Sequence, residues 1–335
     1  MSALLTNTHP GLRAFWHPVA EAGEVVAGTP TRATLLGDHY VLWRGDTAVV
    51  AFADSCPHRA TPLSAGTLDG GVLRCAYHGW CFDERGRCVH IPALGAGAVV
   101  PPAAHLAPIR ALEAYGLVWL APDTPRAGVL EVDEWHDSSL RKVWLPPVTI
   151  RTSAGQFLDN FCDFGHFPFV HAGTFGAGED EHVGDFDLAR IEHGYRLVYE
   201  HVARNHEDPL VASGEHPLVQ PRSMTYTFRV PFTARLRIEY PMAGTVNAIL
   251  TWVQPVDRAT SRVYTCMLRN DVHDDAEAAD AVRYELLVLD EDVAMLERLA
   301  TDGIALDARA QVHTRADRCT IELRRCLADA IAEDS

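Results

Sequence analysis

Two short segments of the chain each pair a cysteine with a histidine. The first is Cys56-Pro-His58 and the second is Cys75-Ala-Tyr-His78. Together they offer two thiolates and two imidazoles, which is the ligand set of a two-iron, two-sulfur cluster with two histidines on one iron. Each iron then collects ligands from both segments, with Cys56 and Cys75 on the inner iron and His58 and His78 on the outer one. A cluster of this kind carries single electrons.

A structural zinc site is the rival interpretation of these four residues, because zinc also binds two cysteines and two histidines in a tetrahedron. Zinc modules usually keep like ligands together, whereas each segment here mixes one cysteine with one histidine. The mixed pairing favours the two-iron cluster. The intervening run 59–74 contains Gly66, Gly70 and Gly71, which is typical of a hairpin between two ligand loops.

The composition is that of an ordinary globular protein. The chain has 335 residues, 47% of them hydrophobic and 22% charged, which is enough for two domains. Its net charge of -16 argues against nucleic acid as a partner, because phosphate binding relies on Lys and Arg. Residues 1–18 lack the pattern of a targeting segment, and no apolar run is long enough to span a bilayer. We therefore expect a cytoplasmic protein without membrane contact, whose cysteines are reduced.

The first part of the chain predicts an all-β domain. Between residues 31 and 119, short β-rich runs alternate with turn residues, and the expected strands are 39–43, 48–52, 71–74, 88–91 and 116–120. The proline-containing stretch 121–126 predicts a boundary. We therefore expect one domain at residues 1–125 and a second at residues 126–335.

The second part predicts a mixture of strands and helices. The expected strands are 143–150, 195–199, 225–230, 234–239, 247–253 and 262–268, and the expected helices are 154–166 and about 276–300. A curved antiparallel sheet with helices on one side is the natural packing, so the fold class is α+β. Residues 204–223 carry three prolines and no clear periodicity, which predicts a loop.

A second group of polar residues lies among aromatic side chains in the predicted helix 154–166 and just beyond it. Asp159, Asp163 and His166 share one helical face by their spacing. Pro168 cannot continue the helix, so His171 must come from a distorted continuation or a loop. Two histidines five residues apart across such a break can converge on one metal ion. The alternative is a set of polar residues on a solvent-exposed face.

A third metal ligand is expected on the long helix, where Asp290, Glu291 and Asp292 interrupt an apolar stretch. A buried carboxylate without a partner is destabilised by several kcal/mol, so an acid here needs a cation or a donor. Two histidines and one carboxylate form the facial triad of non-heme Fe(II) oxygenases, which leaves adjacent positions open for dioxygen. Periodicity does not choose among the three acids.

Five segments resemble those of the Rieske non-heme iron oxygenases. The cluster loops read Cys-Pro-His-Arg and Cys-x-Tyr-His-Gly-Trp, and residues 160–171 match Asn-x-x-Asp-x-x-His-x4-His. The Glu-Asp-x4-Glu pattern at 291–297 and the segment 316–325 are similar to the vanillate O-demethylase and dicamba-demethylase-like branch and to saxitoxin-pathway hydroxylases. The resemblance is weakest at about 173–260, where substrate contacts are expected.

The resemblance implies both the architecture and the roles of the residues. It implies a Rieske domain followed by a helix-grip (START-like) catalytic domain with a substrate cavity, bordered by residues 204–223. It selects Asp292 as the third ligand, beside His166 and His171. It makes Asp163 the carboxylate that links the cluster to the iron, and Asn160 a neighbour of the metal. The cofactors are then one 2Fe-2S cluster and one mononuclear Fe(II) per subunit.

The implied activity is that of an oxygenase component. Electrons come from NAD(P)H through a separate reductase or ferredoxin, and cross between subunits of a homotrimer. We expect hydroxylation or oxidative demethylation of a small aromatic or polycyclic substrate, with N-oxygenation or cis-dihydroxylation as alternatives. A competing hypothesis is a non-catalytic Rieske electron-transfer or binding protein. Arg59, Arg85 and Arg87 either bind an acidic electron donor or form an ordinary solvated face.

Overall fold

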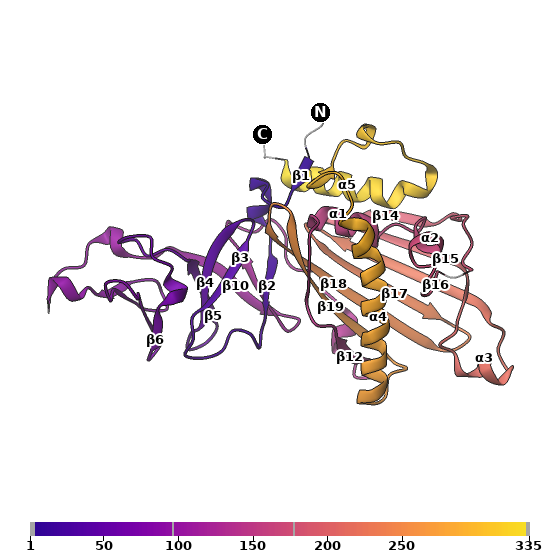
Figure 1. Cartoon of the computed structure of the whole chain (residues 1–335), viewed down its shortest axis with the longest axis horizontal. Coiled ribbons are helices and arrows are strands. Elements are labelled where there is room, and N and C mark those ends of the chain that lie inside the picture. The colour runs from indigo at the N-terminus through magenta and orange to yellow at the C-terminus, as the bar shows by residue number, and fades with distance from the viewer. Residues whose placement is uncertain (1–3, 96, 177, 333–335) are drawn as a thin grey trace. The chain divides into compact units, whose positions relative to one another are not determined.

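The computed structural model describes residues 4–95, 97–176 and 178–332. The chain forms two compact units (Figure 1). One unit is Thr8–Gly128, and the other is the chain from Val129 onward together with the N-terminal segment up to Asn7. In that second unit, the strand β1 (Leu4–Thr6) pairs antiparallel with β20 (Gly303–Ala305).

The first unit is built from two antiparallel sheets. The larger sheet has the strand order β2 (His17–Glu21), β11 (Leu117–Ala121), β10 (Pro108–Ala114), β5 (Val49–Ala53), β4 (Asp38–Arg44), β3 (Thr31–Leu35). The smaller sheet has the order β6 (Thr67–Asp69), β7 (Val72–Arg74), β8 (Cys81–Phe82), β9 (Cys88–His90). Short 3-10 helices lie at Pro10–Ala14, Leu63–Ala65, Pro92–Leu94 and Pro102–Ala104.

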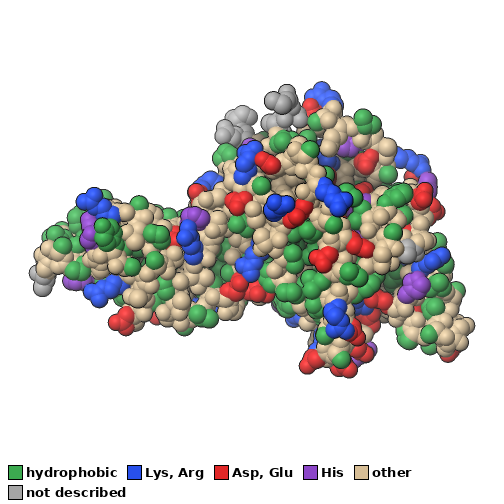
Figure 2. Space-filling model, in the orientation of Figure 1, with side chains coloured by type: hydrophobic (Ala, Val, Ile, Leu, Met, Phe, Trp, Pro, Cys, Tyr) green, Lys and Arg blue, Asp and Glu red, His purple; other side chains and the backbone are tan. Residues whose placement is uncertain are grey.

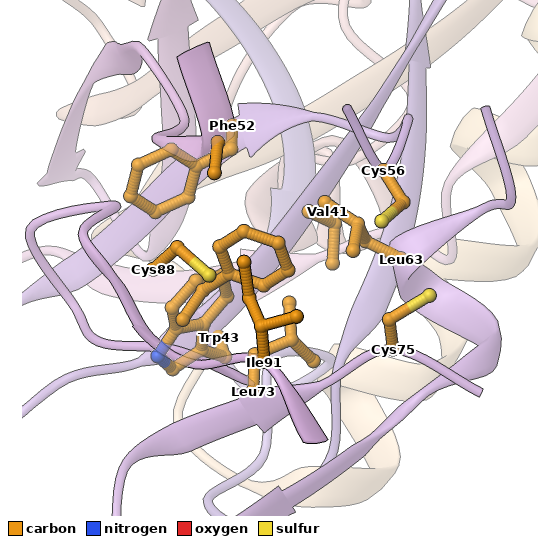
Figure 3. Close-up of a cluster of buried hydrophobic side chains, with 11 residues drawn as sticks. Val41, Trp43, Phe52, Cys56, Leu63, Leu73, Cys75, Cys88 and Ile91 are labelled. Carbon is orange, nitrogen blue, oxygen red and sulfur yellow. The ribbon is translucent and has the colours of Figure 1, made fainter. Parts of the chain in front are cut away.

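A buried apolar cluster joins the two sheets of this unit. The rings of Trp43 and Phe52 stack with their centroids 5.2 Å apart, and Leu73 and Phe82 from the smaller sheet are fully buried against the same cluster. Burial of each such side chain contributes roughly 1.5–3 kcal/mol. Figure 3 shows Cys56 and Cys75 on one side of this cluster and Cys88 on the other. This buried cluster therefore supports the loops that carry Cys56 and Cys75.

The second unit is an eight-stranded antiparallel sheet with helices. Its strand order is β12 (Arg141–Trp144), β19 (Thr260–Arg269), β18 (Thr245–Asp257), β17 (Thr233–Tyr240), β16 (Val219–Arg229), β15 (Gly194–Arg204), β14 (Asp187–Ile191), and β13 (Val148–Ile150) also pairs with β19. The helices are α1 (Ala154–Phe161), α2 (Phe167–Val170), α3 (Pro209–Ser213), α4 (Asp275–Leu296) and α5 (Arg318–Ile331), with 3-10 turns at Asp133–His136, Ala308–Ala310 and Arg315–Asp317. Figure 1 shows α4 crossing one face of the sheet. The predicted α+β class is confirmed.

Capping residues fix where the two site-bearing helices begin. Ser153 and Gln156 form a capping box at the start of α1, since the Ser153 hydroxyl accepts from the Gln156 amide and the Gln156 side chain accepts from the Ser153 amide. Asp274 caps α4 by accepting from the amide of Glu277. Exposed acidic side chains gather at this end of α4 (Figure 2), where they complement the positive end of the helix dipole.

Two predictions about these elements are wrong. The helix expected at 154–166 ends at Phe161, so Asp163 and His166 lie in the turn that follows it. The loop expected at 204–223 contains α3 and the first residues of β16, because Asp208 caps α3 and the strand starts at Val219. Strand pairing with β15 overrides the local sequence preference there.

No helix in the described ranges is both long and apolar enough to cross a bilayer.

Candidate metal centres

Backbone hydrogen bonds close each of the two cysteine-bearing loops. In the first, the amide of Cys56 donates to the carbonyl of Thr61 at 2.9 Å, and in the second the amide of Cys75 donates to the carbonyl of Trp80 at 2.8 Å. Gly79 adopts a φ of +68° in the second loop, a left-handed conformation that costs glycine little. Both cysteines are 2% exposed, so each thiol is held at the buried base of its loop.

The two loop histidines lie beside each other toward the surface. The rings of His58 and His78 have centroids 4.4 Å apart, and His58 stacks on Trp80 at 4.8 Å with the planes 7° apart. Nδ1 of His58 is buried and has no hydrogen-bond partner. A buried nitrogen without a partner is costly unless it binds something, so this donor fits a metal ligand. Two buried thiols and two histidines therefore suit a 2Fe-2S cluster.

A second set of possible metal-binding atoms converges on one point in the second unit. Nε2 of His166 lies 3.2 Å from Nε2 of His171 and 3.4 Å from Oδ1 of Asp292, and the last two atoms are 3.2 Å apart. Bonds of about 2.1 Å to one ion place neighbouring ligands about 3 Å apart, so the three atoms fit one face of an octahedron. Among the described residues, this is the one group of His, Cys, Asp or Glu ligand atoms that all lie within 4.8 Å of one another.

Local backbone structure brings the two histidines together. After α1 ends, His166 occupies the N-cap position of the short helix α2, and His171 occupies its C-cap. Pro168 lies in the first turn of α2, where its missing N–H removes no helical hydrogen bond. The amide of His171 donates to the carbonyl of Phe167 at 3.1 Å. Pro168 thus lies in the turn that aims both imidazoles at Asp292.

Acidic partners orient both imidazoles through their second nitrogen. Nδ1 of His166 lies 3.1 Å from Oδ2 of Asp163, and Nδ1 of His171 lies 2.9 Å from Oε2 of Glu291. The Thr174 hydroxyl also donates to Glu291, at 2.7 Å. A histidine that donates from Nδ1 to a carboxylate keeps Nε2 free of a proton and able to bind metal. Both histidines therefore present the correct nitrogen.

The three acids of α4 have three different positions. Asp292 faces the two histidines and also accepts a hydrogen bond of 2.8 Å from the side-chain amide of Asn160. Glu291 contacts His171 from behind, and Asp290 is exposed. From the sequence we considered Glu291 only as an alternative metal ligand. Its role as the partner of Nδ1 of His171 was not predicted. An acid next to a ligand on a helix, about 100° around the axis, was the available signal.

The ionisation of the site carboxylates suits a cation. Burial opposes the charge of Asp292, but its interactions with His166 and His171 and the hydrogen bond from Asn160 outweigh the effect of burial and hold the pKa of Asp292 far below its usual range. Burial likewise opposes the charge of Asp163, and its interactions with His166 lower the pKa of Asp163. Both groups are therefore anionic at neutral pH.

Asp159 lies apart from these groups. Its two carboxylate oxygens accept hydrogen bonds of 2.8 and 2.7 Å from the guanidinium of Arg324, which is almost fully buried in α5. The predicted shared face of Asp159, Asp163 and His166 is wrong, because the helix stops before Asp163. Asp159 instead fixes α1 to α5.

Near the cluster loops, Arg87 is paired with Asp83 at 2.7 Å, while Arg59 and Arg85 are exposed.

A cavity of about 390 Å³ adjoins the three converging ligands. His166, His171 and Asp292 all line it. Aromatic and aliphatic side chains form much of its lining, among them Phe157, Phe161, Phe167, Phe175, Met224, Tyr226, Leu236 and Ile249. Alternate residues of β18 line it from the sheet, as a strand with one face toward the cavity requires. A small organic molecule can thus lie against the candidate metal.

Comparison with known proteins matches both units. The Rieske 2Fe-2S domain matches residues 15–110, and the vanillate O-demethylase oxygenase C-terminal domain matches residues 150–333. The methylxanthine N1-demethylase NdmA of Pseudomonas putida is 28% identical over 97% of this chain and 91% of its own length, and the N3-demethylase NdmB of the same organism is 26% identical over 96% and 94%. The structure of NdmA with caffeine superposes with a TM-score of 0.82 at 25% identity, covering 98% of this chain and 99% of the other.

This chain belongs to the Rieske non-heme iron oxygenases, in the branch that carries the vanillate O-demethylase C-terminal domain. It is a monooxygenase of this family with a 2Fe-2S cluster and a mononuclear iron. Members of the family receive electrons from a separate reductase or ferredoxin and act on small molecules. The family assignment removes the hypothesis of a non-catalytic carrier. It also excludes a structural zinc in the cysteine loops.

Proposed function

We propose that this enzyme removes a methyl group oxidatively from nitrogen or oxygen of a small organic substrate. The observation that carries the proposal is that His166, His171 and Asp292 converge at the edge of a largely apolar cavity that all three line. The similar proteins NdmA and NdmB are named as methylxanthine demethylases, and the fold is shared with dicamba monooxygenase (TM-score 0.80, 19% identity, 98% of each chain). Hydroxylation that leaves the carbon in place is the second candidate.

The overall reaction balances with two external electrons. A substrate R–X–CH3, with X nitrogen or oxygen, reacts with O2, two electrons and two protons to give R–XH, formaldehyde and water. The methyl carbon is oxidised, and one oxygen atom of O2 appears in formaldehyde while the other appears in water. Incubation with labelled dioxygen, an electron source and candidate methylated compounds tests this directly. Formaldehyde released in equal amount with the demethylated compound supports demethylation, and it is measured by amount because its oxygen exchanges with water. A labelled hydroxyl on an intact carbon skeleton supports hydroxylation.

The residues that hold the mononuclear iron are assigned as part of this proposal. His166, His171 and Asp292 bind Fe(II), which supplies the dioxygen-activating chemistry of the family. Asp163 and Glu291 keep the two imidazoles in the correct tautomer by accepting from Nδ1. Asn160 donates to the ligating carboxylate and fixes its rotamer. The apolar wall excludes bulk water from the reacting carbon.

The electron route is the second part of the assignment. Cys56, Cys75, His58 and His78 hold the cluster, and the exposed position of His78 suits electron exchange at the surface. Asp163, His166 and segments 181–183 and 314–317 line a shallow surface pocket on the outer side of the iron site. We assign this pocket as the place where the cluster domain of a neighbouring subunit delivers electrons, in a homotrimer. Sedimentation of the purified enzyme tests the trimer.

The electron donor and the compartment complete the proposal. A ferredoxin or flavin reductase that draws on NAD(P)H reduces the cluster, and the enzyme works in the cytoplasm. With Arg87 paired to Asp83, the exposed Arg59 and Arg85 are the better candidates for contact with an acidic donor. Charge reversal at Arg59 and Arg85 should slow reduction of the cluster and weaken its salt dependence. Unchanged reduction kinetics would assign these residues to a solvated face.

A further inference from the structure

Glu285 is a carboxylate of the cavity lining that has no role in holding the metal. Glu285 lies on α4 and lines the cavity, and it forms no hydrogen bond or ion pair with the described residues. Burial, which is the largest effect, raises the pKa of Glu285 to about 7, although the charge of Arg269 opposes the shift. A poorly solvated carboxylate without a partner is costly to keep ionised. The site therefore gains stability when a ligand supplies a donor or a positive charge.

The arginines of the cavity wall do not fill that role. Arg222 is bonded to His201 and to Glu179, and Arg269 is bonded to Asp271 and Glu207 at 2.7 and 3.1 Å. Each of these cations is thus matched by acids of the protein. Arg204, the third arginine of the lining, is exposed to solvent. An anionic aromatic substrate would find Arg222 and Arg269 already paired with acids, with the exposed Arg204 as the remaining arginine of the lining, and would be repelled by an ionised Glu285.

The position of Glu285 defines a second end of the cavity. It precedes Asp292 by seven residues, which places it on the same face of α4 about 10 Å nearer the helix N-terminus. Asn247, on the strand β18, also lines the cavity. Its side-chain amide makes no hydrogen bond to the described residues. It is paired in register with Arg269, whose charge acts on Glu285. The cavity therefore has an oxidising end and a polar end.

We propose that the substrate carries a cationic nitrogen group with N–H donors, bound by Glu285 with help from Asn247, while its methyl group faces the three metal ligands. This inference rests on the proposed demethylation and adds the chemical class of the substrate. The separation of about 10 Å along α4 suits a one-ring or two-ring molecule with the two groups at opposite ends. Aromatic carboxylates are excluded as preferred substrates.

Three isosteric probes test the charge preference. 4-Methoxybenzamidine, 4-methoxybenzamide and 4-methoxybenzoate share one planar shape and carry charges of about +1, 0 and -1 at neutral pH. Their dissociation constants are measured by calorimetry with the anaerobic, oxidised holoenzyme, so that no turnover occurs. We expect the amidine to bind at least about ten-fold tighter than the amide, as for a charge-assisted hydrogen bond, and the benzoate to bind most weakly.

Single substitutions test whether Glu285 causes the expected order of the three affinities. Glu285→Gln keeps the size of the side chain and removes the charge, and it should weaken amidine binding about ten-fold while leaving the amide within about three-fold. Glu200→Gln is the matched control, because Glu200 is an exposed acid of β15 that does not line the cavity. Asn247→Ala should weaken the amidine and the amide together.

The outcomes separate this proposal from the proposed function. Tightest binding of the benzoate or of the neutral amide, no binding of the amidine, or an unchanged amidine affinity in Glu285→Gln would overturn the cationic substrate. None of these results depends on oxygenation. Conversely, an enzyme that binds the amidine through Glu285 but never releases formaldehyde from any N-methyl or O-methyl compound would keep this inference and refute demethylation.

Discussion

Oδ2 of Asp163 lies 3.1 Å from Nδ1 of His166, and the other nitrogen of that imidazole faces His171 and Asp292. One ring thus connects a carboxylate in a surface pocket to the candidate iron site. The ring also explains why two short helices and a turn are arranged here as they are. A single carboxylate fixes the tautomer of a ligand and reaches the surface at which electrons are proposed to arrive.

Replacing Asp163 by Ala tests whether this carboxylate carries electrons to the iron site without being a metal ligand itself. The protein should retain both metal centres, because no proposed ligand is removed, but turnover should fall by about 10- to 100-fold or more. Rapid mixing of the reduced enzyme with substrate and dioxygen measures the rate of cluster reoxidation. Full activity would show that Asp163 does not link the two centres, whereas loss of the mononuclear iron would show that its hydrogen bond to His166 is needed to hold the metal.

The two metal centres should be lost independently. Asp292→Asn removes the anionic ligand of the triad and should lower the iron content from about three to about two per chain, with the visible spectrum of the cluster intact. Cys75→Ala should instead abolish the cluster spectrum. Iron analysis and spectroscopy of both variants provide the measurement. A cluster spectrum that disappears in Asp292→Asn would contradict the assignment.

Glu291 should control how tightly iron is held. Glu291→Gln weakens the acceptor for Nδ1 of His171, so the affinity for Fe(II) should fall by about 10- to 100-fold. Titration of the metal-depleted enzyme with Fe(II) measures the change. Thr174→Val, which removes only the 2.7 Å hydrogen bond to Glu291, should have a smaller effect in the same direction. Equal affinity in the wild type and Glu291→Gln would refute the supporting role.

The buried pair of Asp159 and Arg324 should matter for folding more than for chemistry. Arg324→Gln leaves the Asp159 carboxylate partly buried beside α5 without its cation, and breaking such a pair costs about 3–5 kcal/mol. Urea denaturation measures the free energy of unfolding. The double variant with Asp159→Asn should be more stable than Arg324→Gln alone, because no uncompensated charge remains. Equal stability of the two variants would mean that the charge of Asp159 is solvated.

The ionisation of Glu285 predicts a pH dependence of stability. Its pKa of about 7 in the folded protein exceeds the usual value of 4.5, so the folded state binds the proton more tightly than the unfolded state does. The stabilisation from this group is complete below about pH 4.5 and is lost as the pH rises through 7. Glu285→Gln should therefore melt at nearly the same temperature as wild type at pH 4 but at a higher temperature at pH 8. A difference that is constant with pH would refute the shift.

The motifs were enough to predict the class of enzyme, since ligand types at fixed spacing define metal chemistry without knowledge of the fold. Two cysteines and two histidines in short loops predicted the cluster, and residues 160–171 predicted two of the three triad ligands. The choice of Asp292 over Asp290 and Glu291 needed the family resemblance, because all three acids have apolar neighbours at helical spacing. The structure places Asp292 with the two histidines, Glu291 behind His171 and Asp290 in solvent.

The error at helix α1 shows where local reasoning stops. The spacing of Asp159, Asp163 and His166 fits one helical face, but the helix ends at Phe161, and Asp159 is drawn to Arg324 from 165 residues further along the chain. A contact of that separation leaves no periodic signal in either segment.

Glu285 had no motif, and only the tertiary structure shows that its carboxylate lines a cavity in which Arg222 and Arg269 are already paired with acids. The amino-acid sequence by itself determined which metals this protein binds, because ligand chemistry is encoded in residue type and local spacing. The tertiary structure alone decided which charges remain free to meet a substrate, because pairing between distant charges depends on how strands and helices pack.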